Sequence, residues 1–145
     1  MESLIPESKI RELLPQKIPF EMVSHLISFE ETTVTTGLTI KNDNIFIENG
    51  HFNESGMIEN IAQSIALHIS YAYSLKKEKA PLGYIGAMKN VKVFGFPKLN
   101  DFITTEVQII TEFMGVTLIE GKVICNEKVL MAAQMKTFLS EVPAQ

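Results

Sequence analysis

The chain has 145 residues, 46% of them hydrophobic, and a net charge of −4. This length favours one domain spanning residues 1–145, with enough apolar residues for a sizeable core. The acidic balance argues against nucleic acid as the main partner, and no apolar run reaches the roughly 18 residues of a membrane span. The N-terminus shows no signal-peptide pattern, and the single cysteine, Cys125, cannot form an internal disulfide. These features predict a cytoplasmic protein.

Motifs for cofactors and metals are missing from the sequence. There is no glycine-rich phosphate loop, no CxxC pair and no HExxH motif. We therefore expect neither a cofactor nor a metal site.

The first half of the chain predicts a short helix and two strands. The helix is expected over residues 8–14, because Pro15 ends it. Apolar and alternating patterns predict strands over residues 20–29 and 32–41. The stretch KNDNIFIENG is rich in Asn, Asp and Gly, which indicates a loop.

A long apolar helix is expected over about residues 55–75, where apolar side chains recur at helical spacing. The pattern predicts a helix that is buried on most sides. One polar ridge interrupts it, formed by Glu59, Gln63 and Ser70. His51 comes shortly before the helix, at the end of the loop.

Four strands are expected in the rest of the chain, over residues 82–94, 102–112, 116–125 and 129–139. A single buried helix needs a surface around it. An antiparallel sheet of five or six strands wrapped round one long central helix provides that surface in few layers, which is the α+β hotdog fold. The exposed edges of such a sheet predict a dimer.

Three segments in this order resemble the β-hydroxyacyl-(acyl carrier protein) dehydratases of the hotdog superfamily. They are IRELLPQKIPFEMVSHLISFE, then GHF followed by IENIAQ, then FGFPKLNDFITTEV. The interval HFNESGMIE is shorter than the common loop of that family and lacks its Met-Pro-Gly segment. It is more similar to the dehydratase-like branch of aryl polyene and flexirubin pigment pathways.

The resemblance implies dehydration of a 3-hydroxyacyl thioester, on acyl carrier protein, to the trans-2-enoyl thioester in fatty acid or polyene biosynthesis. It implies that His51 is the base and Glu59 the acid, and that an N–H group near Gly56 binds the thioester oxygen. The candidate substrate-binding residues are Phe52, Gly56, Met57 and Gln63. A histidine suits proton abstraction near neutral pH, and the positive end of a helix stabilises developing negative charge.

The spacing of the two catalytic candidates favours a shared site. His51 and Glu59 are eight positions apart, which is roughly 10 Å or more along a helix. Two side chains at that distance do not serve adjacent carbons of one substrate easily. We therefore expect His51 of one protomer to meet Glu59 of a partner, in a homodimer or in a heterodimer with a related dehydratase.

Other interpretations stay open for these residues. His51 can close a surface turn, Glu59 can make a structural hydrogen bond, and Gln63 can orient Glu59. Flexible apolar side chains are candidates for lining an acyl tunnel, and exposed lysines are candidates for docking an acidic carrier protein. The tunnel candidates are Met22, Phe52, Met57 and Met88, and the docking candidates are Lys76, Lys77, Lys79, Lys89, Lys92 and Lys98.

Two alternative functions also remain. A hotdog thioesterase would use Glu59 to activate water and would not need His51. A non-catalytic subunit would pair with an active dehydratase and shape its site.

Overall fold

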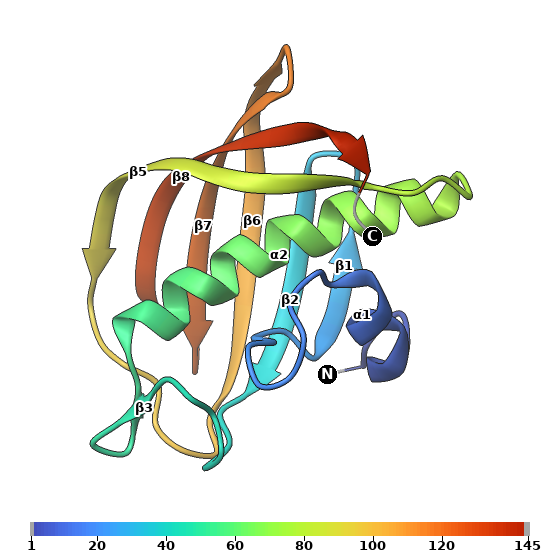
Figure 1. The fold of residues 1–145 in the computed structure, drawn as a ribbon. Helices are drawn as coiled ribbons and strands as arrows, with labels where there is room; N and C mark the ends of the chain where they lie inside the picture. Colours follow the sequence, from blue (N-terminus) through green and yellow to red (C-terminus); the bar gives the residue numbers. More distant parts are fainter. Residues whose placement is uncertain (1, 144–145) are drawn as a thin grey trace.

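A computed structural model describes residues 2–143 of the protein (Figure 1). Helix α1 (Glu7–Leu13) comes first, followed by strands β1 (His25–Phe29) and β2 (Thr33–Thr39). A two-stranded ribbon, β3 (Ile47–Glu48) and β4 (His51–Phe52), leads into the long helix α2 (Glu54–Leu75). Four long strands complete the chain: β5 (Pro81–Val93), β6 (Phe102–Phe113), β7 (Val116–Cys125) and β8 (Lys128–Pro143).

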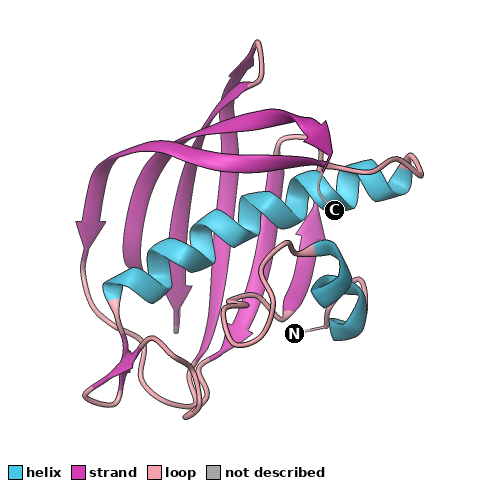
Figure 2. Ribbon diagram, in the orientation of Figure 1, coloured by secondary structure: helices cyan, strands magenta, loops and turns pink. Residues whose placement is uncertain are grey.

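Six strands form one antiparallel sheet in the order β1-β2-β6-β7-β8-β5. The sheet curls around α2, which crosses its concave face, while α1 and the loop after it lie beside the helix (Figures 1 and 2). The predicted α+β hotdog architecture is therefore confirmed. No helix in the described part of the chain is long and apolar enough to cross a bilayer.

The core lies between α2 and the concave face of the sheet. Met57, Ile61 and Ile65 of α2 are at most 3% exposed, as the helical spacing of the apolar residues predicts. Gly121 on β7 allows the helix to approach closely, because a Cβ atom there would collide with the side chain of Ile61. The first half of α2 is thus seated directly on the middle of the sheet.

The strand predicted over residues 20–29 is wrong at its beginning, because β1 starts only at His25. The backbone of Met22 is bonded to side chains of α2 instead of to a neighbouring strand. Its N–H donates to Gln63 Oε1 (2.6 Å), and its carbonyl accepts from Asn60 Nδ2 (2.8 Å). Since these two bonds satisfy the backbone groups of Met22, this part of the chain needs no strand pairing.

The cysteine lies in the sheet, as its position in a strand pattern indicates. Cys125 is 6% exposed, and burial raises the pKa of its thiol, with a further contribution from the nearby charge of Asp101 and a hydrogen bond to it. The thiol therefore stays protonated at neutral pH, which agrees with an inert core residue.

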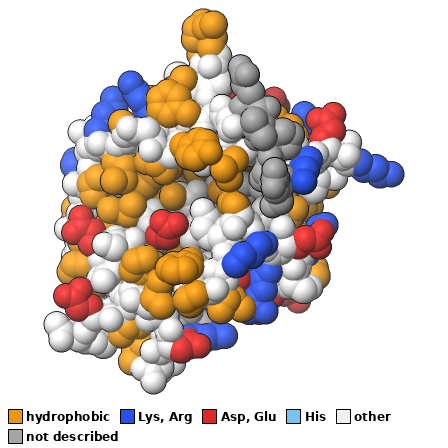
Figure 3. All heavy atoms as spheres, in the orientation of Figure 1, with side chains coloured by type: hydrophobic (Ala, Val, Ile, Leu, Met, Phe, Trp, Pro, Cys, Tyr) orange, Lys and Arg blue, Asp and Glu red, His pale blue; other side chains and the backbone are white. Residues whose placement is uncertain are grey.

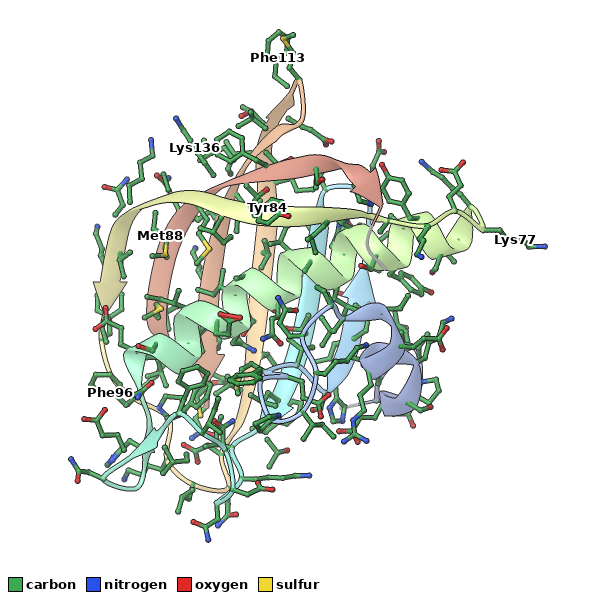
Figure 4. All side chains as sticks on the ribbon, viewed as in Figure 1. Lys77, Tyr84, Met88, Phe96, Phe113 and Lys136 are labelled. Atoms are coloured by element: carbon green, nitrogen blue, oxygen red, sulfur yellow. The ribbon has the colours of Figure 1, made fainter. Side chains whose placement is uncertain are left out.

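The sheet has one long free edge, formed by β5. Bulges interrupt its pairing with β8 at three places, and its outer side has no partner strand within residues 2–143. Tyr84, Ile85 and Met88 are 56%, 41% and 48% exposed on this strand. Tyr84 and Met88 are labelled in Figure 4, and Figure 3 shows apolar side chains gathered on this face of the molecule. A long apolar edge of this kind is a surface for strand pairing with another chain.

Candidate active site

Glu59 lies in the second turn of α2 and is partly exposed. It lines a hollow of about 440 Å³ between the helix, the segment after α1 and the loop before β3. The other residues around this hollow are Pro15, Gln16, Lys17, Phe20 and Phe46. The predicted acid therefore faces a space that can admit a substrate.

Gln63 holds Glu59 in place from one helical turn further along α2. Gln63 Oε1 accepts the Met22 N–H (2.6 Å), so the amide nitrogen must face the other way. That nitrogen lies 2.8 Å from the Phe20 carbonyl oxygen and 3.2 Å from Glu59 Oε1. The side chain is 0% exposed. Within this protomer, Gln63 thus orients Glu59, and its amide has no hydrogen left for a substrate.

His51 lies in β4, ahead of α2. Its Nδ1 atom is 2.9 Å from the carbonyl oxygen of Asn49. Because a carbonyl only accepts, Nδ1 carries the hydrogen, and Nε2 of the neutral ring keeps the lone pair that a general base needs. His51 lines neither the Glu59 hollow nor the larger one described below. One protomer therefore does not bring His51 and Glu59 together in a shared hollow.

The backbone on both sides of His51 is bonded to the segment that follows β5. The Phe52 N–H donates to the Pro97 carbonyl (2.8 Å), and the Leu99 N–H donates to the Gly50 carbonyl (3.3 Å). These bonds fix the histidine backbone against a second stretch of chain.

At the beginning of α2, the N–H group of Gly56 itself donates to the side chain of the N-cap residue Asn53 (2.9 Å), so an oxygen-binding N–H near Gly56 has to come from a neighbouring residue. The amides of Glu54 and Ser55 are the helix-end donors that no described residue uses. Gly56 has a packing role instead, because a Cβ there would lie 2.5 Å from the Phe52 ring.

The predicted apolar contacts with substrate lie in the core of the protomer. Phe52 and Met57 are 0% exposed and Met22 is 1% exposed, so these three side chains line no accessible surface here. Of the four tunnel candidates, only Met88 on β5 is open to solvent.

A second, larger hollow of about 770 Å³ runs along the other half of α2. Its wall on β5 includes Leu82, Tyr84 and Ile85, and α1 closes another side. The helix face that lines it consists of Ala62, Ile65, Ala66, Ile69, Ser70 and Ser74. From the first to the last of these the helix rises about 18 Å. Four small side chains follow one another at a spacing of four residues and leave space beside this face of the helix: Ala62, Ala66, Ser70 and Ser74.

Residues 15–17 border both hollows. Gln16 is one of them, and its Oε1 atom is buried and accepts no hydrogen bond from any residue between 2 and 143. Sequence reasoning missed the larger hollow, because alanine and serine at helical spacing are typical of ordinary packing.

The lysines proposed for docking are all exposed, but they form separate groups. Lys76, Lys77 and Lys79 follow the end of α2, where Figure 4 shows Lys77 pointing away from the body. Lys89 and Lys92 lie on the edge strand β5, and Lys98 pairs with the backbone of His51.

Comparisons with known proteins agree with this geometry. A family model described as ApeP-like, ApeP dehydratase, matches residues 8–145. The 3-hydroxyacyl-[acyl-carrier-protein] dehydratase FabZ of Actinobacillus pleuropneumoniae serotype 5b is 28% identical over 139 residues, covering 91% of this chain and 89% of FabZ.

Two solved structures show the same fold. The dehydratase heterocomplex ApeI:P from Xenorhabdus doucetiae matches with a TM-score of 0.83 at 19% identity, covering 94% of this chain and 92% of that one. A hypothetical thioesterase with coenzyme A from Streptococcus pneumoniae TIGR4 matches with a TM-score of 0.65 at 13% identity, covering 80% and 84%.

Proposed function

The chain belongs to the ApeP-like dehydratase family, and on this basis we propose that it converts 3-hydroxyacyl thioesters on acyl carrier protein to trans-2-enoyl thioesters. The similarity to FabZ, a 3-hydroxyacyl-[acyl-carrier-protein] dehydratase, supports this substrate class. The observation that carries the proposal is the Glu59 carboxylate, which Gln63 holds at the wall of a hollow.

The proposed reaction uses three groups. His51 Nε2 takes the proton from the carbon next to the thioester carbonyl, and the electrons of that C–H bond form the new double bond. The bond to the 3-hydroxyl breaks as Glu59 donates a proton to its oxygen, and water leaves. The free N–H groups at Glu54 and Ser55 stabilise negative charge on the thioester oxygen, because they lie at the positive end of α2.

The acyl chain occupies the larger hollow in this proposal. That hollow is adjacent to the Glu59 hollow, since residues 15–17 border both, and Ala62, Ala66 and Ile69 give it an apolar floor. In this proposal a chain whose reacting carbons lie near Glu59 passes residues 15–17 and extends along α2.

The complete site needs a second protomer. His51 lines neither of the two hollows described above, and β5 presents a free apolar edge. We propose that β5 pairs with a related dehydratase, so that Glu59 works with a histidine of the partner and His51 works with an acid of the partner. The Xenorhabdus structure is described as a dehydratase heterocomplex, which supports a related chain as the partner over a second copy.

Turnover of 3-hydroxyacyl and enoyl thioesters tests the reaction. The purified protein is assayed alone and after co-expression with a related dehydratase, with His51→Ala and Glu59→Ala beside the wild type. We expect each single variant of the complex to lose the one site to which the residue contributes, and the double variant to lose interconversion, while folding is kept. Full activity of the complex with both residues replaced in this chain would instead identify it as a non-catalytic subunit.

The role of β5 is tested by Met88→Glu, which places a charge on the exposed edge. The expected result is loss of the complex in light scattering, because pairing would bury that charge. Phe113→Glu is the matched control, since Phe113 is 75% exposed at the tip of the β6–β7 hairpin, away from β5 (Figure 4). Equal loss of assembly in both variants would remove β5 as the interface.

A thioesterase is the second candidate, favoured by the fold shared with the Streptococcus pneumoniae protein that binds coenzyme A. It would release free acid, with Glu59 activating water. Release of free acid by wild type and by His51→Ala alike would establish it in place of the dehydratase.

A further inference from the structure

A cluster of buried polar side chains lies directly behind Glu59. It consists of Asn60 and Ser64 on α2, Thr36 on β2 and Thr105 on β6, and each of them is 0% exposed. These four residues are called the Asn60 cluster below. The apolar stripe of α2 would have predicted aliphatic side chains at such positions, so the cluster needs its own explanation.

Asn60 connects three separate parts of the molecule. Its Nδ2 atom donates to the Met22 carbonyl (2.8 Å), and its Oδ1 atom accepts from the hydroxyl of Thr105. The side chain therefore ties α2 to the segment before β1 and also to the centre of the sheet. Ser64 makes two bonds, one within α2 to the Asn60 carbonyl and one to the hydroxyl of Thr36 on β2 (both 2.7 Å).

A buried amide is a costly choice unless it fixes a geometry. A buried polar group that loses its hydrogen-bond partner destabilises the fold, whereas aliphatic side chains pack there without that risk. Apolar contacts hold a helix on a sheet but leave its rotation loosely defined, since they have no direction. Hydrogen bonds at Asn60 fix the rotation of α2 at the position next to Glu59.

The same bonds fix one wall of the acid's hollow. Met22 is held on its N–H side by Gln63 and on its carbonyl side by Asn60. Phe20, two residues earlier, lines the hollow together with Glu59. The positions of the Glu59 carboxylate and of the wall at Phe20 therefore both depend on bonds made by residues 60–63 of α2.

We propose that Asn60 is a positioning residue for the dehydration reaction, holding Glu59 and the segment of Phe20 and Met22 in register. The proposal rests on the proposed role of Glu59 as the acid. Misplacement of a catalytic group by 1 Å can cost about 10²-fold in rate. Removal of the Asn60 bonds is expected to lower kcat and leave KM nearly unchanged, because the acyl hollow lies elsewhere on α2.

The test compares Asn60→Leu with Ser64→Ala in the complex, with the partner's own acid replaced so that only the Glu59 site turns over. Leucine has nearly the same size but makes neither of the two side-chain bonds of Asn60. Ser64→Ala is the matched control, since it removes two bonds of equal burial, and neither of them reaches Met22 or Thr105. We expect about a 10²-fold lower kcat for Asn60→Leu with KM unchanged, and nearly wild-type kcat for Ser64→Ala. Equal losses in the two variants would overturn the proposal.

A second measurement does not depend on activity. Amide hydrogen exchange of Met22, whose N–H is bonded to Gln63, reports whether the segment is held. The proposal requires faster exchange there in Asn60→Leu than in wild type, with exchange of β7 unchanged. Unchanged exchange at Met22 would overturn the positioning role even in an active enzyme. If the wild-type complex shows no turnover but Met22 exchanges faster in Asn60→Leu, the result contradicts the dehydratase function and not the holding of the segment by Asn60.

If Asn60→Leu does not fold, Thr105→Val takes its place. It removes only the hydroxyl that donates to Asn60 Oδ1, in a side chain of the same shape. A smaller drop in kcat in the same direction is expected, and no drop would refute the role.

Discussion

The two halves of α2 are built for different tasks. In the first half, Asn60, Gln63 and Ser64 are 0% exposed and hydrogen-bonded, and Ile61 rests against Gly121. In the second half, from Ala66 onward, one face of the helix is lined by small side chains and borders a hollow of about 770 Å³. One half is fixed by directional bonds, and the other leaves space beside it.

The difference teaches how one helix can serve both reaction and binding. A proton donor must be held within a fraction of an ångström, which directional bonds achieve. A flexible acyl chain needs volume and apolar surface but no single geometry. In the proposed mechanism, the division along α2 therefore separates Glu59 and the residues that position it, which should affect rate, from the residues beside the larger hollow, which should affect the preferred chain length.

The largest effect is expected from Glu59→Gln in the first half. Glutamine keeps the shape of the side chain but cannot donate a proton as an acid does. We expect kcat to fall about 10²- to 10⁴-fold for short and long acyl chains alike, with the unfolding midpoint unchanged. Steady-state assays measure this kcat in the complex with the partner's own acid replaced, so that only the Glu59 site turns over. A loss restricted to long chains would assign Glu59 to binding.

A selective effect is expected from Ala66→Phe in the second half. The ring would fill the larger hollow, so kcat/KM should fall about 10- to 200-fold for long acyl chains and little for short ones. Ser70→Ala, on the same face, is the control and should leave the chain-length profile intact. An equal loss for all chain lengths would show that the acyl chain does not lie there.

The close packing of the first half of α2 on the sheet is tested by Gly121→Val. The new side chain would collide with Ile61 and push α2 away from the sheet. We expect a loss of about 1–3 kcal/mol in the free energy of unfolding, measured with urea. Gly83→Ala is the control, because the nearest atom to a Cβ there, on Leu139, is 3.7 Å away. A similar loss in both variants would contradict the close seat of α2.

The smallest effect is expected at the N-cap, Asn53. Asn53→Ala removes the acceptor of the Gly56 N–H and should cost about 1 kcal/mol, whereas Asn53→Gly should cost only a few tenths. Urea unfolding of the two variants measures the difference. Identical stability of both variants and wild type would mean that the cap bond contributes nothing.

Much of the fold was predictable because the sheet pairs regular alternating strands. The pattern over residues 116–125 gave the bounds of β7, and the turn at Asn126 and Glu127 has φ of 51° and 66°, which a two-residue hairpin requires. Prediction failed at residues 20–24. Their apolar composition suits a strand, but the backbone groups of Phe20 and Met22 are bonded to side chains of α2, which local patterns cannot reveal.

The candidate site was predictable only in part. The motif around His51 and Glu59 marked both residues, and the polar ridge included Gln63. Asn60 was missed because an asparagine in an apolar helix has no signature until Thr105 is placed opposite it. The sequence placed the expected N–H donor near Gly56 but could not say which amide is free, because the cap bond from the Gly56 N–H to Asn53 depends on side-chain geometry.

The link between β5 and His51 has an evolutionary consequence. The strand that offers the free edge continues directly into Pro97 and Leu99, whose backbone groups hold the chain on both sides of the histidine. In the proposed assembly, substitutions that refit residues 81–99 to a new partner also shift the support of His51. If β5 is the interface and His51 the base, selection on partner choice and selection on turnover act on the same stretch of chain.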